Sequence, residues 1–252
     1  MEEISQWMLV NKLKLNASKT EMLVVTRKSF VTASESIQVH FGDATITPQR
    51  VVKNLGGIFD HEMSMAKQAQ HATKSAYFHL RRISKIRPYI SKKACAAAIH
   101  STVTSRLDYH NGLLLGAPKN ITKRMQVAQN SAARLLTQTS KREHITPILA
   151  QLHWLPVEKR ISYKALCMVH SAIHDDCAPL YLKDMCQMYV PRRALRSDDD
   201  NFKLVVSNDS NSYGRRAFDS CAFRLWNCLP LALRMISKKD CFSRIPLKLS
   251  FI

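Results

Sequence analysis

The sequence predicts an α+β fold, with a small strand-containing N-terminal region followed by a longer, mainly helical one. Short apolar runs bounded by turn residues fill the first sixty positions, and apolar residues at helical spacing dominate from Met63 onward. No run approaches the roughly 18 apolar residues that a membrane span requires. A chain of 252 residues that is 46% hydrophobic is long enough to bury a sizeable core. Its acidic start, Met1-Glu2-Glu3, is unlike a signal peptide.

The N-terminal region contains one helical pattern, at residues 2–13, and strand patterns at residues 21–26, 37–41 and 51–59. Gly42-Asp43 resembles a tight turn that leads from the second strand into Ala44–Thr47. Within the last strand, Gly56-Gly57 indicates a bulge or a close backbone approach. These short elements predict a small α+β piece.

Residues 63–86 predict a helix with one apolar and one basic side. The apolar side carries Ala69, Ala72, Ala76, Leu80, Ile83 and Ile86. At 100° per residue, Lys67, Lys74, Arg81 and Lys85 fall within about 40° of one another on the opposite side. Pro88 ends the pattern.

Four further helices are predicted, at residues 92–107, 121–136, 157–174 and 217–235. Ser91 is placed to cap the first of them. Residues 192–212 are rich in Arg, Asp, Asn and Ser, and they predict a mobile loop that holds a short strand at 202–206.

Charge is the most informative compositional feature. The segment from Met63 to Arg142 contains fifteen Lys and Arg and one acid, Asp108, so it carries +14 of the net +19. Self-repulsion of this size destabilises a compact chain unless a polyanion relieves it, which indicates a nucleic acid as the partner. An anionic membrane surface fits less well, because the basic faces lack opposing Trp- and Phe-rich faces.

Sites that carry chemistry are sparse. Cys167, His170, His174 and Cys177 share one helical face, but ten residues of helix span about 15 Å, too far for one zinc ion. Polymerase chemistry needs clustered carboxylates for two metal ions, and Asp198-Asp199-Asp200 lies in the predicted loop, where a solvated charge run is expected. The seven cysteines include no C-x-x-C pair, which indicates reduced thiols in an intracellular protein.

Several phrases, in order, resemble the C-terminal part of reverse transcriptases from non-LTR retrotransposons of the LINE type (CR1, L2 and jockey-like). They are Trp7 with Asn11-Lys12-Leu13-Lys14-Leu15-Asn16 and Ser18-Lys19-Thr20-Glu21, Leu55-Gly56-Gly57-Ile58-Phe59-Asp60, Ser105-Arg106-Leu107-Asp108-Tyr109, Gln129-Asn130-Ser131-Ala132-Ala133-Arg134-Leu135-Leu136, His153-Trp154-Leu155-Pro156-Val157, Gly214-Arg215-Arg216-Ala217-Phe218, and Leu225-Trp226-Asn227 with Leu229-Pro230. The resemblance covers nearly the whole chain. One departure is Ala222-Phe223, where the family usually has Ala-Pro.

The resemblance implies three regions: the end of a polymerase palm at 1–61, a basic helical thumb at 62–142, and a C-terminal helical region at 143–252. It implies that Lys19 lies near the phosphates of the incoming nucleotide, with a turn-exposed lysine as the alternative. It also implies that a primer grip, formed by Leu55, Gly56, Gly57, Ile58 and Phe59, lines the primer terminus through its backbone.

For the thumb, the resemblance and the charge together predict a surface for a template–primer duplex of RNA and DNA. Its candidate residues are Lys67, Lys74, Arg81, Lys85, Lys92, Lys93, Lys123 and Arg124. For Asp108 and Tyr109 a structural role is expected, with Asp108 paired to Arg106 or a neighbour. Trp154 and Trp226 are expected to be core anchors.

The family's catalytic Asp-Asp strand pair should lie just before residue 1, and it is missing from this sequence. Three hypotheses follow: a truncated RNA-directed DNA polymerase that is inactive alone, a non-enzymatic nucleic-acid-binding module, and a decayed transposon relic. The full-length enzyme of this family would use Mg²⁺, whereas no cofactor is expected in this chain. The expected location is intracellular, in the nucleus or in a cytoplasmic ribonucleoprotein.

Overall fold

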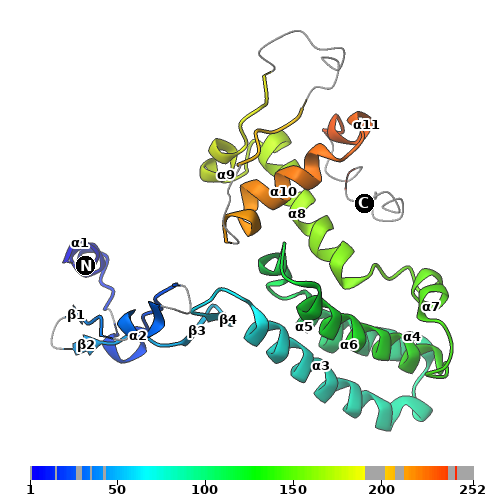
Figure 1. Cartoon of the computed structure of the whole chain (residues 1–252). Coiled ribbons are helices and arrows are strands. Elements are labelled where there is room, and N and C mark those ends of the chain that lie inside the picture. Colours follow the sequence, from blue (N-terminus) through cyan, green and yellow to red (C-terminus); the bar gives the residue numbers. More distant parts are fainter. Residues whose placement is uncertain are drawn as a thin grey trace. The chain divides into compact units, whose positions relative to one another are not determined.

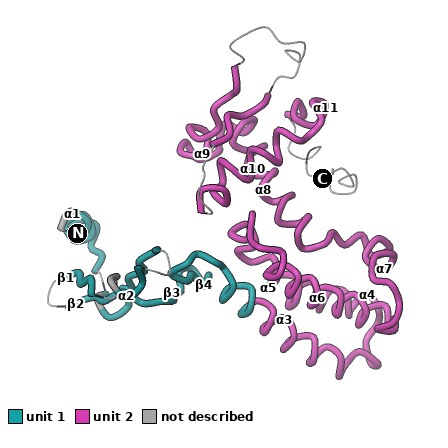
Figure 2. Tube along the Cα trace, viewed as in Figure 1, with its two compact units in different colours: residues 1–71 teal, residues 72–252 magenta. Residues whose placement is uncertain are grey.

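The computed structural model of the chain describes residues 2–14, 16–26, 30–34, 36–41, 44–190, 202–207, 213–237 and 242. The predicted α+β class is confirmed: helices dominate, and the strands of these residues form two separate two-stranded antiparallel sheets (Figure 1). The chain divides into two compact units, residues 1–71 and 72–252 (Figure 2). The predicted three-region division stays a prediction.

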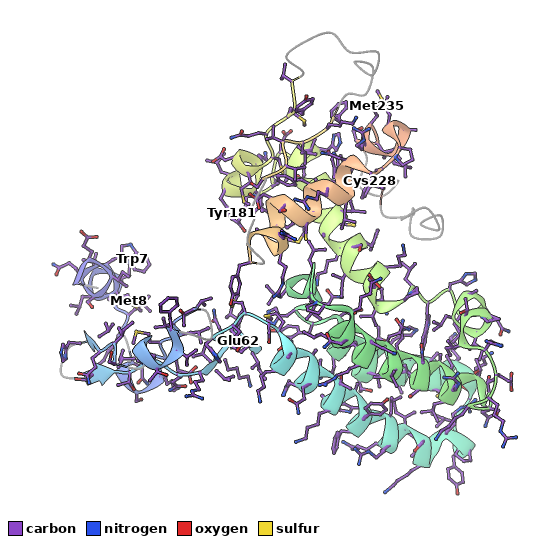
Figure 3. The ribbon with its side chains drawn as sticks, viewed as in Figure 1. Trp7, Met8, Glu62, Tyr181, Cys228 and Met235 are labelled. Carbon is purple, nitrogen blue, oxygen red and sulfur yellow. The ribbon has the colours of Figure 1, made fainter. Side chains whose placement is uncertain are left out.

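Unit 1 begins with helix α1, Glu2–Val10, which confirms the predicted helix and ends before residue 13. Four of its apolar residues, Ile4, Trp7, Leu9 and Val10, are exposed, Trp7 by 62%, whereas Met8 is half-buried. Figure 3 labels Trp7 and Met8. A 3-10 turn, η1, follows at Ala17–Lys19, and a short helix, α2, at Val31–Ser34.

The strand predicted at residues 21–26 is wrong. Met22 makes only an isolated parallel bridge with Pro48. A strand needs a partner along its length, and both neighbouring hairpins pair within themselves. Residues 21–26 are nevertheless held in place, because Thr26 N–H donates to the His61 carbonyl at 3.1 Å.

The first hairpin confirms the predicted strand pair. Strand β1, Val39–Phe41, pairs with β2, Ala44–Ile46, so that Val39 lies opposite Ile46. The predicted turn at Gly42-Asp43 lies outside the described residues.

The second hairpin corrects the prediction of a single strand over residues 51–59. Strand β3, Val51–Asn54, pairs with β4, Gly57–Asp60, and Asn54 lies opposite Gly57. Both residues between the strands have positive φ, 48° at Leu55 and 82° at Gly56, the pattern of a type I′ turn. Gly56 therefore closes a hairpin and does not mark a bulge.

Asp60 organises the turn that leads out of β4. Its buried carboxylate accepts hydrogen bonds from Ser64 N–H at 2.8 Å, Ser64 Oγ at 3.0 Å and Met65 N–H at 3.0 Å. The next helix, α3, Ala66–Ile86, begins directly after this turn and continues from unit 1 into unit 2. Buried Gln68, in its first turn, accepts from Ile58 N–H at 3.0 Å and ties the start of α3 to β4.

Unit 2 contains the longer helices. After a 3-10 turn at Arg87–Tyr89 come α4, Lys92–Ile99, a π-helical turn, His100–Thr104, and α5, Ser105–Asp108. This run confirms the predicted helix over 92–107, and Ser91 caps it by accepting from Ala94 N–H at 3.2 Å. The π turn was not predicted.

The remaining helices before the C-terminal region are α6, Lys119–Thr137, α7, Ile145–Gln151, α8, Val157–His174, and α9, Leu180–Met185, with a 3-10 turn at Asn111–Leu114. α6 confirms the predicted helix over 121–136, and α8 has the predicted bounds. Tyr77 Oη on α3 lies 3.5 Å from Ser131 Oγ on α6, so these two helices are neighbours.

The C-terminal region forms α10, Phe218–Asn227, and α11, Leu231–Arg234, which Pro230 separates. Trp226 is fully buried, as predicted, and its Nε1–H donates to the Phe202 carbonyl at 2.8 Å. The Asn227 side chain bonds both backbone groups of Leu204, at 2.9 Å each. Since residues 202–206 gain only a single bridge, between Leu204 and Met188, the strand predicted there is wrong.

Most of the predicted loop at 192–212 lies outside the described residues. Across the part of the chain that is described, no helix is both long and apolar enough to cross a bilayer.

Candidate nucleic-acid interface

Helix α3 has the two faces that its sequence predicts. Ala69, Ala72, Ala76, Leu80 and Ile83 are at most 6% exposed, whereas Ile86, at the helix end, is 48% exposed. The predicted basic residues Lys67, Lys74, Arg81 and Lys85 are all exposed. The whole helix contains no acid. Burial of the alanine-rich face therefore fixes the cations toward solvent.

The basic face of α3 is long. At 1.5 Å per residue, Lys67 and Lys85 lie about 27 Å apart along the helix axis. Duplex nucleic acid carries about one negative charge per 1.7 Å of its axis, so a length of about 27 Å on a duplex contains many phosphates. The first cation, Lys67, belongs to unit 1, and the other three belong to unit 2.

Helices α4 and α6 add the other predicted cations. Lys92 and Lys93 form the exposed first turn of α4, and Lys123 and Arg124 are exposed near the start of α6. Throughout the described ranges, none of the eight candidate cations forms an ion pair with an acid.

Three other arginines of the basic segment contact groups within the protein. The Arg87 guanidinium donates to the carbonyls of Ile90 at 3.1 Å, Leu136 at 3.2 Å and Leu135 at 3.3 Å. Arg134 donates to the Ser140 and Glu143 carbonyls, at 3.3 and 3.0 Å. The Arg82 guanidinium lies 5.6 Å from the centre of the Phe78 ring. The charge count alone could not separate these arginines from the exposed candidate cations.

Asp108, expected to pair with Arg106 or a neighbour, pairs with Arg160 on α8 and not with Arg106. The partner lies 52 residues further along the chain, a distance that no helical spacing reveals. Burial raises the pKa of the Asp108 carboxyl, although the charges of Arg160 and Lys164 act to lower it. The pair is structural, as expected for Asp108, and it joins α5 to α8.

In unit 1, Lys19 is exposed at the end of η1. The five primer-grip candidates do not share one environment: Leu55 is 81% exposed at the hairpin turn, while Gly57 is buried in β4. Ile58 and Phe59 are half-buried in the same strand, and Gly56 is half-buried at the turn. The roles that the resemblance implies for Lys19 and for this hairpin stay predictions.

His170 and His174 serve the core. Their Nε2 atoms hydrogen-bond the carbonyls of Ile236, at 2.5 Å, and Arg234, at 3.0 Å. Both rings also contact Trp226. No group of three or more His, Cys, Asp or Glu residues within the described ranges is arranged to hold a metal ion.

Comparison of the chain with known protein families, with curated proteins and with solved structures finds no match.

Proposed function

We propose that this chain binds a nucleic-acid duplex through the basic face of α3, together with the exposed cations of α4 and α6. The supporting observation is the row Lys67, Lys74, Arg81 and Lys85, exposed on a helix without acids and free of ion pairs within the described residues. Contacts of this kind recognise phosphates and not bases, so the binding is tolerant of sequence and sensitive to salt.

We further propose, from the resemblance in sequence, that the chain is the C-terminal part of a non-LTR retrotransposon reverse transcriptase. In that role the basic helices hold an RNA–DNA template–primer duplex, the Leu55–Phe59 hairpin approaches the primer terminus, and Lys19 approaches nucleotide phosphates. The catalytic aspartates belong to a part of the enzyme that this sequence does not contain.

A second candidate is a nucleic-acid-binding module without catalysis. It is consistent with the lack, within the described residues, of any acidic cluster able to hold metal ions, which the first candidate also expects. Both candidates use the same basic surface, and they differ in whether the binding serves the catalytic part of a reverse transcriptase. The third hypothesis, a relic without selected function, makes no demand on that surface.

Binding is tested by fluorescence anisotropy with a labelled RNA–DNA duplex across a salt series from about 50 to 200 mM. We expect log K to fall linearly with log salt concentration. A variant with Lys67, Lys74, Arg81 and Lys85 all changed to Glu loses up to four phosphate contacts, so its slope becomes shallower by about 3 to 4. Its affinity also falls steeply at every salt concentration.

In the matched control, four exposed cations elsewhere are changed to Glu: Lys12, Lys14, Lys53 and Arg224. This variant has the same net charge as the α3 variant, so it separates a local surface from a general attraction. We expect it to retain most of the affinity and of the salt slope. Equal losses in the two variants, or an unchanged affinity in the α3 variant, would refute the proposed interface.

A further inference from the structure

A cavity of about 830 Å³ opens in unit 2 between the π turn and helix α8. This volume is within the range of small-molecule sites in proteins, which is about 300–1,000 Å³. Leu149 and Ala150, at the end of α7, also line it. None of the eight candidate cations of the proposed duplex surface lines it, so the cavity is a separate feature.

The π turn aligns polar residues along one wall. His100 and Thr104 are its first and last residues, and Asp108 follows four positions later at the end of α5. All three line the cavity. In a regular α-helix, residues at this spacing drift around the axis, and the wider π turn offsets that drift. Single π turns within α-helices are frequent at functional sites.

A tryptophan forms part of the opposite wall. Trp154 is only half-buried, so its expected role as a core anchor is only partly correct: it packs against Ala133, Ile148 and Leu149 and also lines the cavity. Its ring lies 5.2 Å from the His100 ring at an interplanar angle of 68°. An aromatic side chain that lines a cavity offers a surface for stacking of an unpaired base.

The turn that carries Trp154 contains a residue with a strained backbone, His153. Trp154 N–H donates to the Leu149 carbonyl at 2.9 Å, and His153 N–H donates to the Ala150 carbonyl at 3.0 Å, which together form a Schellman motif at the end of α7. His153 occupies its left-handed position, with φ 54°, where glycine is usual. An imidazole that lines the cavity thus stands where glycine would be less strained.

The polar groups of the cavity suit a nucleotide. Lys164 is exposed at its rim, and its ammonium uses one hydrogen bond, to the Asp108 carbonyl at 3.4 Å. The Asn111 Nδ2 donates to Asp108 Oδ1 at 3.2 Å, which fixes the orientation of the amide. Asn111 also lines the cavity, and its buried Oδ1 accepts no hydrogen bond from the described residues, which leaves an unsatisfied acceptor at this wall.

We propose that this cavity holds one unpaired nucleotide of the bound nucleic acid, its base stacked on Trp154 and its phosphate against Lys164. The inference depends on the proposed function, because the nucleotide is part of the same nucleic acid. Tyr163, whose pKa is raised by burial and by a hydrogen bond with Cys167, stays a neutral phenol at the wall and adds no competing charge.

The test compares the affinity for a duplex with a short single-stranded overhang with that for the blunt duplex of the same sequence. We expect the wild-type chain to prefer the overhang by about tenfold, the range that one stacked base provides. Lys164→Glu, His100→Ala and Trp154→Ala should bring this ratio close to one and leave the affinity for the blunt duplex nearly unchanged. Lys164 and His100 are exposed, so their variants test the site even if Trp154→Ala unfolds.

The matched control is Lys183→Glu, a charge reversal on α9 outside the cavity, which should keep the wild-type ratio. A ratio of one in the wild-type chain, or an unchanged ratio in all three cavity variants, would overturn the proposal. A chain that binds no duplex at all would refute the proposed function first. Titration with free adenosine monophosphate, followed by Trp154 fluorescence with Trp154→Phe as the blank, then decides whether the cavity takes a nucleotide: quenching supports it and a flat titration rejects it.

Discussion

Arg81 and Arg87 are six residues apart in the sequence, and yet their side chains lie in different environments. Arg81 is exposed on α3 and has no ion pair within the described part of the chain. Arg87 directs its guanidinium inward, onto the last carbonyls of α6. These carbonyls lack partners within their own helix, so the arginine satisfies acceptors that the helix leaves open. The difference depends on a helix that begins more than thirty residues later in the sequence.

Replacement of Arg87 measures this contribution. We expect Arg87→Ala to lower the free energy of unfolding by about 2 kcal/mol, because three hydrogen bonds to backbone carbonyls are lost. Urea denaturation of the full chain measures the change. Arg82→Ala is the control, since it removes an exposed cation–π contact of about 0.5–1 kcal/mol at most. An Arg87→Ala effect no larger than that of the control would contradict the capping role.

Among the secondary-structure elements, the hairpin β3–β4 shows how a turn overrides a strand pattern. The apolar run over residues 51–59 reads as one strand, but a two-residue turn at Leu55-Gly56 folds it back on itself. The type I′ turn requires positive φ at both central positions, and Asn-Gly is its preferred sequence. Leucine at the first position is therefore strained, in a segment that the family resemblance associates with the primer.

The strain predicts that Leu55→Asn stabilises the hairpin by about 0.5–1 kcal/mol, since asparagine tolerates left-handed backbone. Gly56→Ala should destabilise it by about 1 kcal/mol, because its φ is 82°. Hydrogen exchange of the β3 and β4 amides in the full chain reports both changes locally. Leu55→Val is the control, and slower exchange in this variant would argue against the turn type.

The π turn is a second feature on this scale that no sequence pattern indicated. Residues 92–107 predict one regular helix, and the helix forms, but its widened turn at His100–Thr104 sets the direction of the residues that follow. Asp108, at the end of α5, pairs with Arg160 on α8. The irregular turn is therefore followed by a tertiary contact, which the local sequence pattern does not indicate.

For the whole molecule, the distribution of charge carries the functional argument. Most of the net charge lies between residues 63 and 142, and the structure places its candidate cations on the exposed sides of α3, α4 and α6. Burial of the apolar sides of α3 and α6 leaves these cations at the surface. The sequence could predict this arrangement because the helical period alone assigns each residue to a side.

We also predict that the purified chain performs no metal-dependent primer extension. No carboxylates of the described residues are grouped to bind the metal ions that nucleotide transfer requires. The measurement is incorporation of labelled deoxynucleotides on a primed RNA template with Mg²⁺, with an active reverse transcriptase as the positive control. Template-dependent incorporation by this chain would show that its carboxylates form an active site after all.

The sequence by itself determined the long helices, the Ser91 cap, the first hairpin and the basic side of α3. Each depends on residues close together in the chain, where periodicity and capping chemistry act directly. Only the tertiary structure decided that residues 51–59 form a hairpin, that Arg160 pairs with Asp108, and that Arg87 caps α6. It also placed Trp154 beside His100 at a cavity. These features join residues far apart in the chain or depend on a rare backbone conformation, and no local period encodes either of them.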